Sequence, residues 1–249
     1  MAKKYKLYEH FLLVAALALD EFAEIYVHGI RAHKRSYWNS WLPQHINSKN
    51  SAHNALQNLY RAGYLEKIIK KGKPHLRITP KGEVKLKRDF NILHWQKHKW
   101  DQCWRLVIFD IPQKKRYKRD KLREKLVELG FACWQRSIYL SPYDLNEDVY
   151  EFLEKQQLYG QAFVLTARHE LLGEAKELAA KIWNIDKLEE KYDSLYQEIK
   201  QARTNGKQED IRKIKDDFIS LMREDPHLPL ELLPEDWIGL KVQRVIVKL

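Results

Sequence analysis

The middle of the chain constrains the fold most, because short apolar runs alternate there with charged stretches of helical character. Residues 104–111 (WRLVIFDI) have the composition of a buried strand, and 114–129 have the leucine spacing of a helix that ends at a glycine. Residues 131–141 predict a second strand or a tight pair of strands, 144–158 a second helix, and 161–167 a last strand. The order β-α-β-(β)-α-β predicts a ferredoxin-like domain in an α+β protein.

The positive charge of the chain is confined to its first hundred residues. Over 249 residues, 45 Lys and Arg against 34 Asp and Glu leave a formal net charge of +11. Residues 1–100 hold 19 basic and 7 acidic side chains, whereas 101–180 hold 13 of each and 181–249 hold 13 and 14. A basic segment beside two neutral ones is typical of a module that binds a polyanion, joined to parts with other tasks.

The rest of the composition excludes several classes of protein. Hydrophobic residues make up 44% of the chain and aromatic residues 12%, more than a disordered chain carries. Only two cysteines are present, Cys103 and Cys133, without C-x-x-C spacing, which argues against a disulfide framework or a cysteine zinc site and favours a reducing compartment. We therefore expect a folded, cytoplasmic protein.

An apolar run near the start of the chain resembles the core of a signal peptide. Residues 11–19 (FLLVAALAL) follow three lysines, but acidic residues come directly afterwards, and apolar positions continue to residue 27 as in one long helix. The run is also shorter than the roughly 20 apolar residues that span a bilayer. We expect a buried helix here and no membrane partner.

Residues 48–79 have the layout of a winged helix-turn-helix domain. Residues 48–60 (SKNSAHNALQNLY) predict a helix with one apolar and one polar face, and Gly63 can end it. Two β-like runs around the turn KKGKP predict a basic hairpin after it. In such a domain the helix binds in the major groove of DNA, and the hairpin, or wing, contacts the phosphates. The predicted DNA-binding residues are Lys49, Asn50, His53, Asn54, Gln57, Lys70, Lys71, Lys73 and Arg77.

Two strings of the sequence resemble the PaaX family of phenylacetate-catabolism repressors. One covers residues 106–144 (LVIFDIPQKKRYKRDKLREKLVELGFACWQRSIYLSPYD), and its domain is similar to the dimeric nuclease of CRISPR spacer acquisition. The other covers residues 225–239 (DPHLPLELLPEDWIG). The N-terminal part matches by layout only, and residues 32–43 do not align. The resemblance implies a dimeric repressor that an acyl-CoA-like effector releases from its operator.

Asp110 carries the alternative function. In the CRISPR nuclease family an Asp at the end of the first strand pairs with its copy across the dimer axis, and the two hold Mg²⁺ for phosphodiester cleavage. No second carboxylate has a fixed spacing to Asp110 within this chain. A structural role, such as capping the next helix, is the other interpretation. We expect no catalytic residue, no cofactor and no metal, with Mg²⁺ only under the nuclease alternative.

A second basic cluster lies within the neutral middle of the chain. Residues 114–125 contain eight Lys and Arg against two acidic residues. A solvated helix face is one explanation; contacts to the phosphates of DNA or of an acyl-CoA effector are the others.

The last third predicts two helices over 185–199 and 209–223, each with one apolar stripe that either packs on the other helix or forms a dimer interface. A proline-rich path follows, in which Trp237 docks, and 240–249 have β character.

These patterns together predict four parts: a winged helix DNA-binding domain (1–88), a linker (89–100), a ferredoxin-like dimerisation domain (101–180) and a helical regulatory domain (181–249). The chain is therefore predicted to be a transcriptional regulator, a repressor of PaaX type. It is expected to bind specific sequences in double-stranded DNA as a homodimer. Besides the nuclease, an architectural DNA-binding protein without effector is a further alternative.

Overall fold

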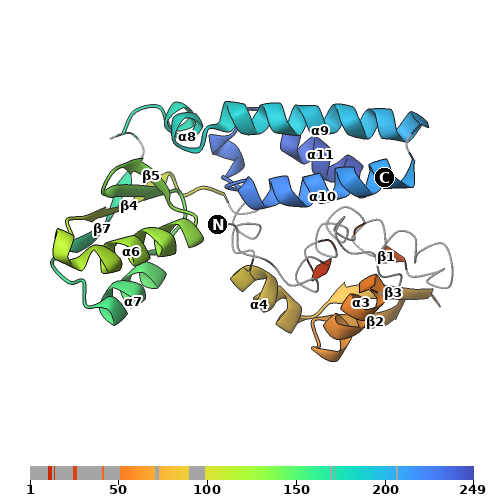
Figure 1. Cartoon of the computed structure of the whole chain (residues 1–249), viewed down its shortest axis with the longest axis horizontal. Coiled ribbons are helices and arrows are strands. Elements are labelled where there is room, and N and C mark those ends of the chain that lie inside the picture. Colours follow the sequence, from red (N-terminus) through yellow and green to blue (C-terminus); the bar gives the residue numbers. More distant parts are fainter. Residues whose placement is uncertain are drawn as a thin grey trace. The chain divides into compact units, whose positions relative to one another are not determined.

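The computed structural model describes residues 11–12, 14, 25–26, 41, 51–70, 73–89, 99–168, 170, 172–205 and 207–249 (Figure 1). The chain forms two compact units, each built from segments that are distant in sequence. One unit comprises Met1–Phe90, Leu188–Asp225 and Trp237–Leu249, and the other comprises Asn91–Lys187 and Pro226–Asp236. Within the described residues, no helix combines the length and the apolar character needed to cross a membrane.

The central unit contains a four-stranded antiparallel sheet. Its strands are β4 (Cys103–Phe109), β5 (Ala132–Gln135), β6 (Ile138–Ser141) and β7 (Ala162–Arg168), in the order β5-β6-β4-β7. This order confirms the ferredoxin-like fold and shows that residues 131–141 form a pair of strands.

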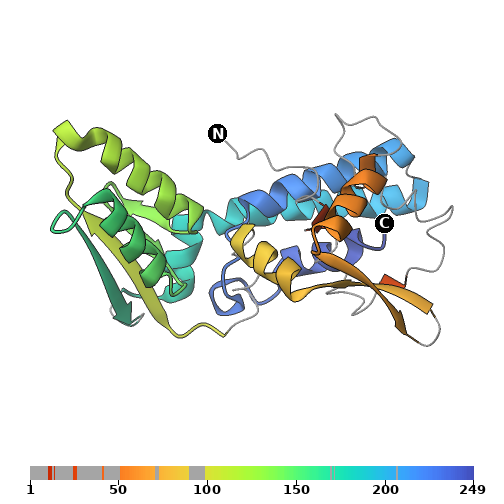
Figure 2. The same ribbon diagram turned by 90° about the horizontal axis from the view of Figure 1, so that it is seen from below.

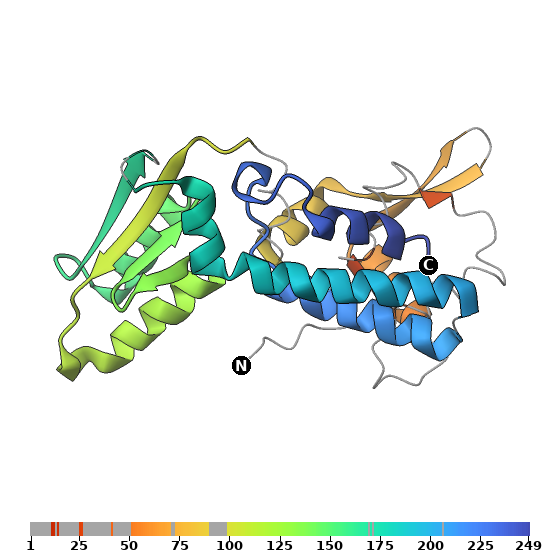
Figure 3. The ribbon, with the colours of Figure 1, turned by 90° about the horizontal axis from the view of Figure 1, so that it is seen from above.

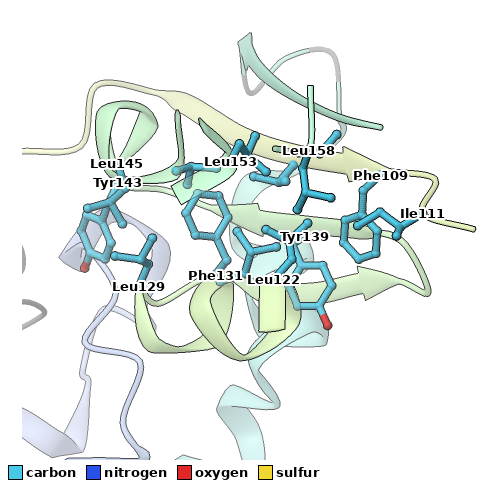
Figure 4. Packing of buried hydrophobic residues seen from close by; sticks show 14 residues of the cluster. Phe109, Ile111, Leu122, Leu129, Phe131, Tyr139, Tyr143, Leu145, Leu153 and Leu158 are labelled. Carbon is cyan, nitrogen blue, oxygen red and sulfur yellow. The ribbon is translucent and has the colours of Figure 1, made fainter. Parts of the chain in front are cut away.

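Helices cover one face of this sheet. The short η1 (Gln113–Lys115) leads into α6 (Arg116–Glu128), and α7 (Asn146–Gln156) follows β6. Val107 and Phe109 of β4 pack with leucines of both helices, among them Leu122 and Leu153 (Figure 4). Alternation along β4 puts Val107 and Phe109 on the helix side, so Leu106 and Ile108 lie on the opposite face.

Tryptophans cover part of that opposite face. Trp104 of β4 is fully buried, and its ring stacks on Trp183 with 6.1 Å between centroids. Trp183 ends α8 (Ala175–Trp183), a helix that contacts β5 and to which our sequence analysis assigned no element. On the edge strand β7, by contrast, Phe163 and Leu165 remain 57% and 49% exposed.

The C-terminal helices belong to the other unit. α9 (Ile185–Asn205) and α10 (Gln208–Glu224) confirm the predicted helical pair and run side by side (Figure 3). Trp237 is buried and meets Tyr192 of α9 edge-on, as expected for a docked residue.

The prediction of β structure over 240–249 is wrong, since α11 spans Ile238–Ile246. The segment is rich in β-branched residues, but Gly239, Val242 and Ile246 are buried at helical spacing, and burial of this stripe outweighs strand propensity.

The N-terminal part of the same unit contains a helix and a small sheet. α3 (Ser51–Arg61) precedes β2 (Leu65–Lys70) and β3 (Lys73–Ile78), and α4 (Pro80–Asp89) follows. A third strand, β1 (Ile25–Tyr26), pairs with β3 (Figure 2).

The prediction of one continuous helix up to residue 27 is therefore wrong. Residues 11, 12 and 14 are helical, but Ile25 and Tyr26 have the β-branched and aromatic character that favours pairing with a strand.

Candidate nucleic-acid interface

The polar face of α3 is exposed as predicted. His53, Asn54 and Gln57 are exposed, whereas Ala55 and Leu59 are buried on the opposite side. Asn58 and Arg61 are exposed on the same polar face, and our sequence analysis missed both. The helical spacing from Gln57 to Arg61 is the signal that could have found the arginine, because residues four apart share a face.

The end of α3 is fastened to the start of α4. Gly63 adopts φ +73°, a left-handed conformation that ends the helix as predicted. The Thr79 hydroxyl donates to the Gly63 carbonyl at 2.5 Å, and Lys81 Nζ donates to the Ala62 carbonyl at 2.8 Å. The last turn of α3 is therefore held by residues that follow the hairpin.

Gly82 allows the close approach of α4 to the start of β2. A Cβ atom at this position would lie 2.2 Å from the Tyr64 carbonyl oxygen and 2.8 Å from the Ile78 side chain. The Gly82 N–H also donates to Thr79 Oγ1, which caps α4. This packing fixes the path of the hairpin relative to α3.

The hairpin of β2 and β3, here called the wing, places two predicted DNA contacts opposite each other. Lys70 pairs in register with Lys73 at the end of the wing. Arg77 lies further from that end, where its Nε donates to Glu66 Oε1 at 2.7 Å in an exposed ion pair. Glu66 therefore competes with any phosphate for Arg77.

Three predicted DNA contacts, Lys49, Asn50 and Lys71, lie outside the described residues. The structure thus brings His53, Asn54 and Gln57 together on one helix face, and Lys70 and Lys73 together at the end of the wing.

Asp110 is exposed directly after β4. Its N–H donates to the Gln161 carbonyl at 2.9 Å. Among the described residues, no group of three or more His, Cys, Asp or Glu side chains could hold a metal ion. Asp110 offers a single carboxylate, so the described residues of one chain do not fit a magnesium site.

A buried arginine organises the start of β4. Arg105 donates to both carboxylate oxygens of Asp101, at 2.8 and 2.5 Å, and lies 3.2 Å from Asp144. Partial burial raises the pKa of Asp101, but the hydrogen bond and charge of Arg105 outweigh it, so the pKa lies below its usual value. This cluster has the character of a structural anchor because the buried guanidinium is paired with two carboxylates through its Nη atoms.

Two tyrosines form hydrogen bonds with the start of the proline-rich segment that follows α10. The Tyr192 hydroxyl donates to Asp225 at 2.6 Å, and burial followed by the charge of Asp225 raises the pKa of Tyr192 well above its usual value. The Tyr143 hydroxyl donates to the His227 carbonyl. His227 has φ +49°, which is uncommon outside glycine. The conformation of this segment is therefore fixed by buried hydrogen bonds.

Comparison with known proteins identifies the central and C-terminal parts of the chain. Residues 97–179 match the central Cas2-like domain of PaaX proteins, and 183–249 match the PaaX-like protein C-terminal domain. Together these matches cover more than half of the chain. No curated protein matches the chain.

One similar solved structure is the uncharacterized protein Rv0674 from Mycobacterium tuberculosis, which has 18% identity and a TM-score of 0.51. The match covers 95% of this chain and 92% of that one. At this identity the likeness concerns the fold alone. The two family domains support a PaaX-like regulator, and the chain belongs to the PaaX family.

Proposed function

We propose that this chain is a cytoplasmic, PaaX-like transcriptional repressor that binds double-stranded DNA as a homodimer. The observation that carries the proposal is the exposed polar face of α3, with His53, Asn54 and Gln57, beside a wing that ends in Lys70 and Lys73. No residue is assigned a catalytic role.

Each part of this surface has a distinct task. The amides of Asn54 and Gln57 present a donor and an acceptor, the pair that matches the major-groove edge of adenine. Lysines at the end of the wing, together with Arg61, neutralise phosphates and so supply affinity without sequence preference. The net positive charge of the first hundred residues supports the same assignment.

The homodimer is proposed to form through β7. This strand lies at the edge of its sheet, and its outer face exposes Phe163 and Leu165, which are in register with Ile108 and Leu106 of β4. Edge strands with exposed apolar side chains favour pairing with another chain. Two-fold symmetry would then place two α3 helices on a palindromic operator.

The effector is proposed from the family alone. An acyl-CoA thioester would lower the affinity for the operator, as the resemblance implies. Addition of coenzyme A thioesters to the assay below tests this point, and unchanged DNA binding with every thioester would contradict it.

The test compares the upstream intergenic DNA of the gene with a scrambled duplex in a mobility shift at about 150 mM salt. The double variant Asn54→Ala/Gln57→Ala should lose about 10-fold or more of its preference, since a bidentate base contact contributes about 1–3 kcal/mol of discrimination. The control is Gln197→Ala, an exposed glutamine on α9, which should keep the preference.

Two results would overturn the proposal. One is full preference for the native duplex in the Asn54→Ala/Gln57→Ala variant. The other is cleavage of the duplex in Mg²⁺ that Asp110→Asn abolishes, because the nuclease alternative predicts that outcome and a repressor does not.

A further inference from the structure

The basic residues of α6 are sorted by type onto two flanks. Arg116, Arg119 and Arg123 follow one another at steps of three and four, and so do Lys118, Lys121 and Lys125. The buried leucines Leu122 and Leu126 lie between the two sets, which places the arginines on one flank of the helix and the lysines on the other. A helix face that is merely solvated does not need this separation.

The lysine flank is engaged within the central domain. Lys118 Nζ donates to the Gln156 carbonyl at 2.6 Å, and Lys121 Nζ lies 4.5 Å from the centre of the Tyr117 ring. Lys125 forms a looser ion pair, 3.8 Å from Glu128. Each lysine therefore has a local partner.

The arginine flank has an excess of charge. Its three guanidinium groups share a single carboxylate, that of Asp120, with N–O distances of 3.4 Å to Arg116, 4.0 Å to Arg119 and 3.6 Å to Arg123. The Nε of Arg119 is buried and has no hydrogen-bond partner among the described residues. One carboxylate cannot saturate three guanidinium groups, so donors remain for an incoming anion.

A fourth arginine lies in the β5–β6 turn, which Arg123 contacts. Arg123 donates to the Arg136 carbonyl at 3.1 Å, which holds the β5–β6 turn beside α6, and the Arg136 side chain is exposed. Arg123 also lies over the Phe109 ring, at 5.9 Å. Its guanidinium is thus positioned by the sheet, and part of the ordering cost of binding has already been met.

We propose that the arginine flank, formed by Arg116, Arg119 and Arg123, binds phosphate groups together with Arg136. Guanidinium is planar and donates two parallel hydrogen bonds to phosphate, which makes arginine better suited to this ligand than lysine. Asp120 keeps the three guanidinium groups of α6 close together in the absence of the anion. The phosphates come from the backbone of bound DNA or from a nucleotide ligand such as coenzyme A, and the latter source rests on the proposed effector.

The experiment uses the full chain with two matched double variants. Arg116→Gln/Arg123→Gln removes two charges from the arginine flank, and Lys121→Gln/Lys125→Gln removes two charges from the opposite flank of the same helix. Affinity is measured for a scrambled duplex over a series of salt concentrations, and separately for coenzyme A by calorimetry. Arg116→Lys/Arg123→Lys keeps the charge but loses the planar donors, and circular dichroism checks folding.

If the phosphates belong to DNA, the arginine-to-glutamine variant should bind the duplex about 10-fold more weakly, with a salt slope about 2 units shallower. The lysine-to-glutamine control should change affinity by no more than about 2-fold. If they belong to a nucleotide, the arginine-to-glutamine variant should lose coenzyme A and keep the duplex affinity of the control. The inference would be overturned if the arginine-to-glutamine and lysine-to-glutamine variants bound the duplex equally well and also bound coenzyme A equally well.

These outcomes are separate from those of the α3 variants. Asn54→Ala/Gln57→Ala removes sequence preference and leaves phosphate contacts in place, whereas the arginine variant weakens binding to all duplexes alike or lowers the affinity for coenzyme A alone. A result that contradicts base recognition by α3 therefore does not contradict phosphate binding by the arginine flank. The converse also holds.

Discussion

Lys215 of α10 makes the pH dependence of stability predictable. Its side chain is 1% exposed, and Nζ lies 4.8 Å from the centre of the Trp41 ring, which also packs on Phe218 of the same helix. Burial lowers the pKa of Lys215 from 10.5 to about 7. The folded chain therefore holds this amine neutral at pH values where the unfolded chain protonates it.

The sign and size of the effect follow from linkage. Between about pH 7 and 10.5 the unfolded state binds one proton more than the folded state, so the free energy of unfolding rises with pH in this window. The limit is about 1.4 kcal/mol per pH unit for one proton. From pH 7.5 to 9.5 we expect Lys215 to contribute a rise of about 2–3 kcal/mol, and below pH 7 its contribution stops changing.

The test is urea unfolding of the wild type and of Lys215→Met, followed by circular dichroism across this pH range. Because all other groups are shared, the difference between the two proteins isolates Lys215. The control is Lys213→Met on the same helix. Lys213 is exposed and paired with Asp217 at 3.0 Å, so its pKa is raised and it stays protonated throughout the window. Parallel pH curves for the wild type and Lys215→Met would refute the reasoning.

Three further predictions concern α4, the wing and the proposed dimer. Gly82→Ala should lower the free energy of unfolding by about 2–3 kcal/mol in urea titrations, because the added Cβ would lie 2.2 Å from a backbone oxygen. A change below about 0.5 kcal/mol, the level of a neutral surface substitution, would contradict this prediction. Glu66→Gln should raise affinity for a scrambled duplex about 2- to 5-fold by releasing Arg77, while stability changes by less than about 1 kcal/mol. Unchanged affinity would argue against a phosphate contact by Arg77. Phe163→Asp should convert the proposed dimer to a monomer in analytical ultracentrifugation. The control Tyr159→Asp, at an exposed site outside β7, should leave the dimer intact. A dimeric Phe163→Asp protein would exclude the β7 interface.

The sequence predicts the central fold well because each of its elements carries a consistent local signal. Residues 104–111 are apolar and short, 114–129 have helical leucine spacing, and Gly130 adopts the positive φ of 89° that ends such a helix. The order of these elements allows few sheet topologies, and the observed order is one of them.

The errors arise where long-range contacts oppose local preference. Residues 240–249 have strand-like composition, but burial of Val242 and Ile246 makes them helical. Ile25 and Tyr26 continue an apolar pattern of helical type, yet they pair with β3, which lies some fifty residues further along the chain. No window of neighbouring residues contains either contact.

For the candidate DNA surface, the sequence predicts which face of α3 is polar but not which charged side chains form ion pairs. Polar spacing identified the face of α3, because the period of a helix is local. The ion pair of Glu66 with Arg77 depends on the register of the wing, and the burial of Lys215 depends on contact with Trp41. A lysine in an amphipathic helix is typical of solvent-exposed surface, so nothing local marks Lys215 as buried.

The discontinuous make-up of the first unit has a consequence for synthesis. Met1–Phe90 leave the ribosome well before Leu188–Asp225 and Trp237–Leu249, with which they form one compact body. Trp41 can therefore pack on Phe218 and Lys215 only after α10 has been synthesised. The candidate DNA-binding face of α3 belongs to the same unit, which needs these later segments for its full set of contacts. Ribosome-bound chains that stop before α10 should therefore be sensitive to protease within residues 1–90, and chains that extend through α10 should be less so.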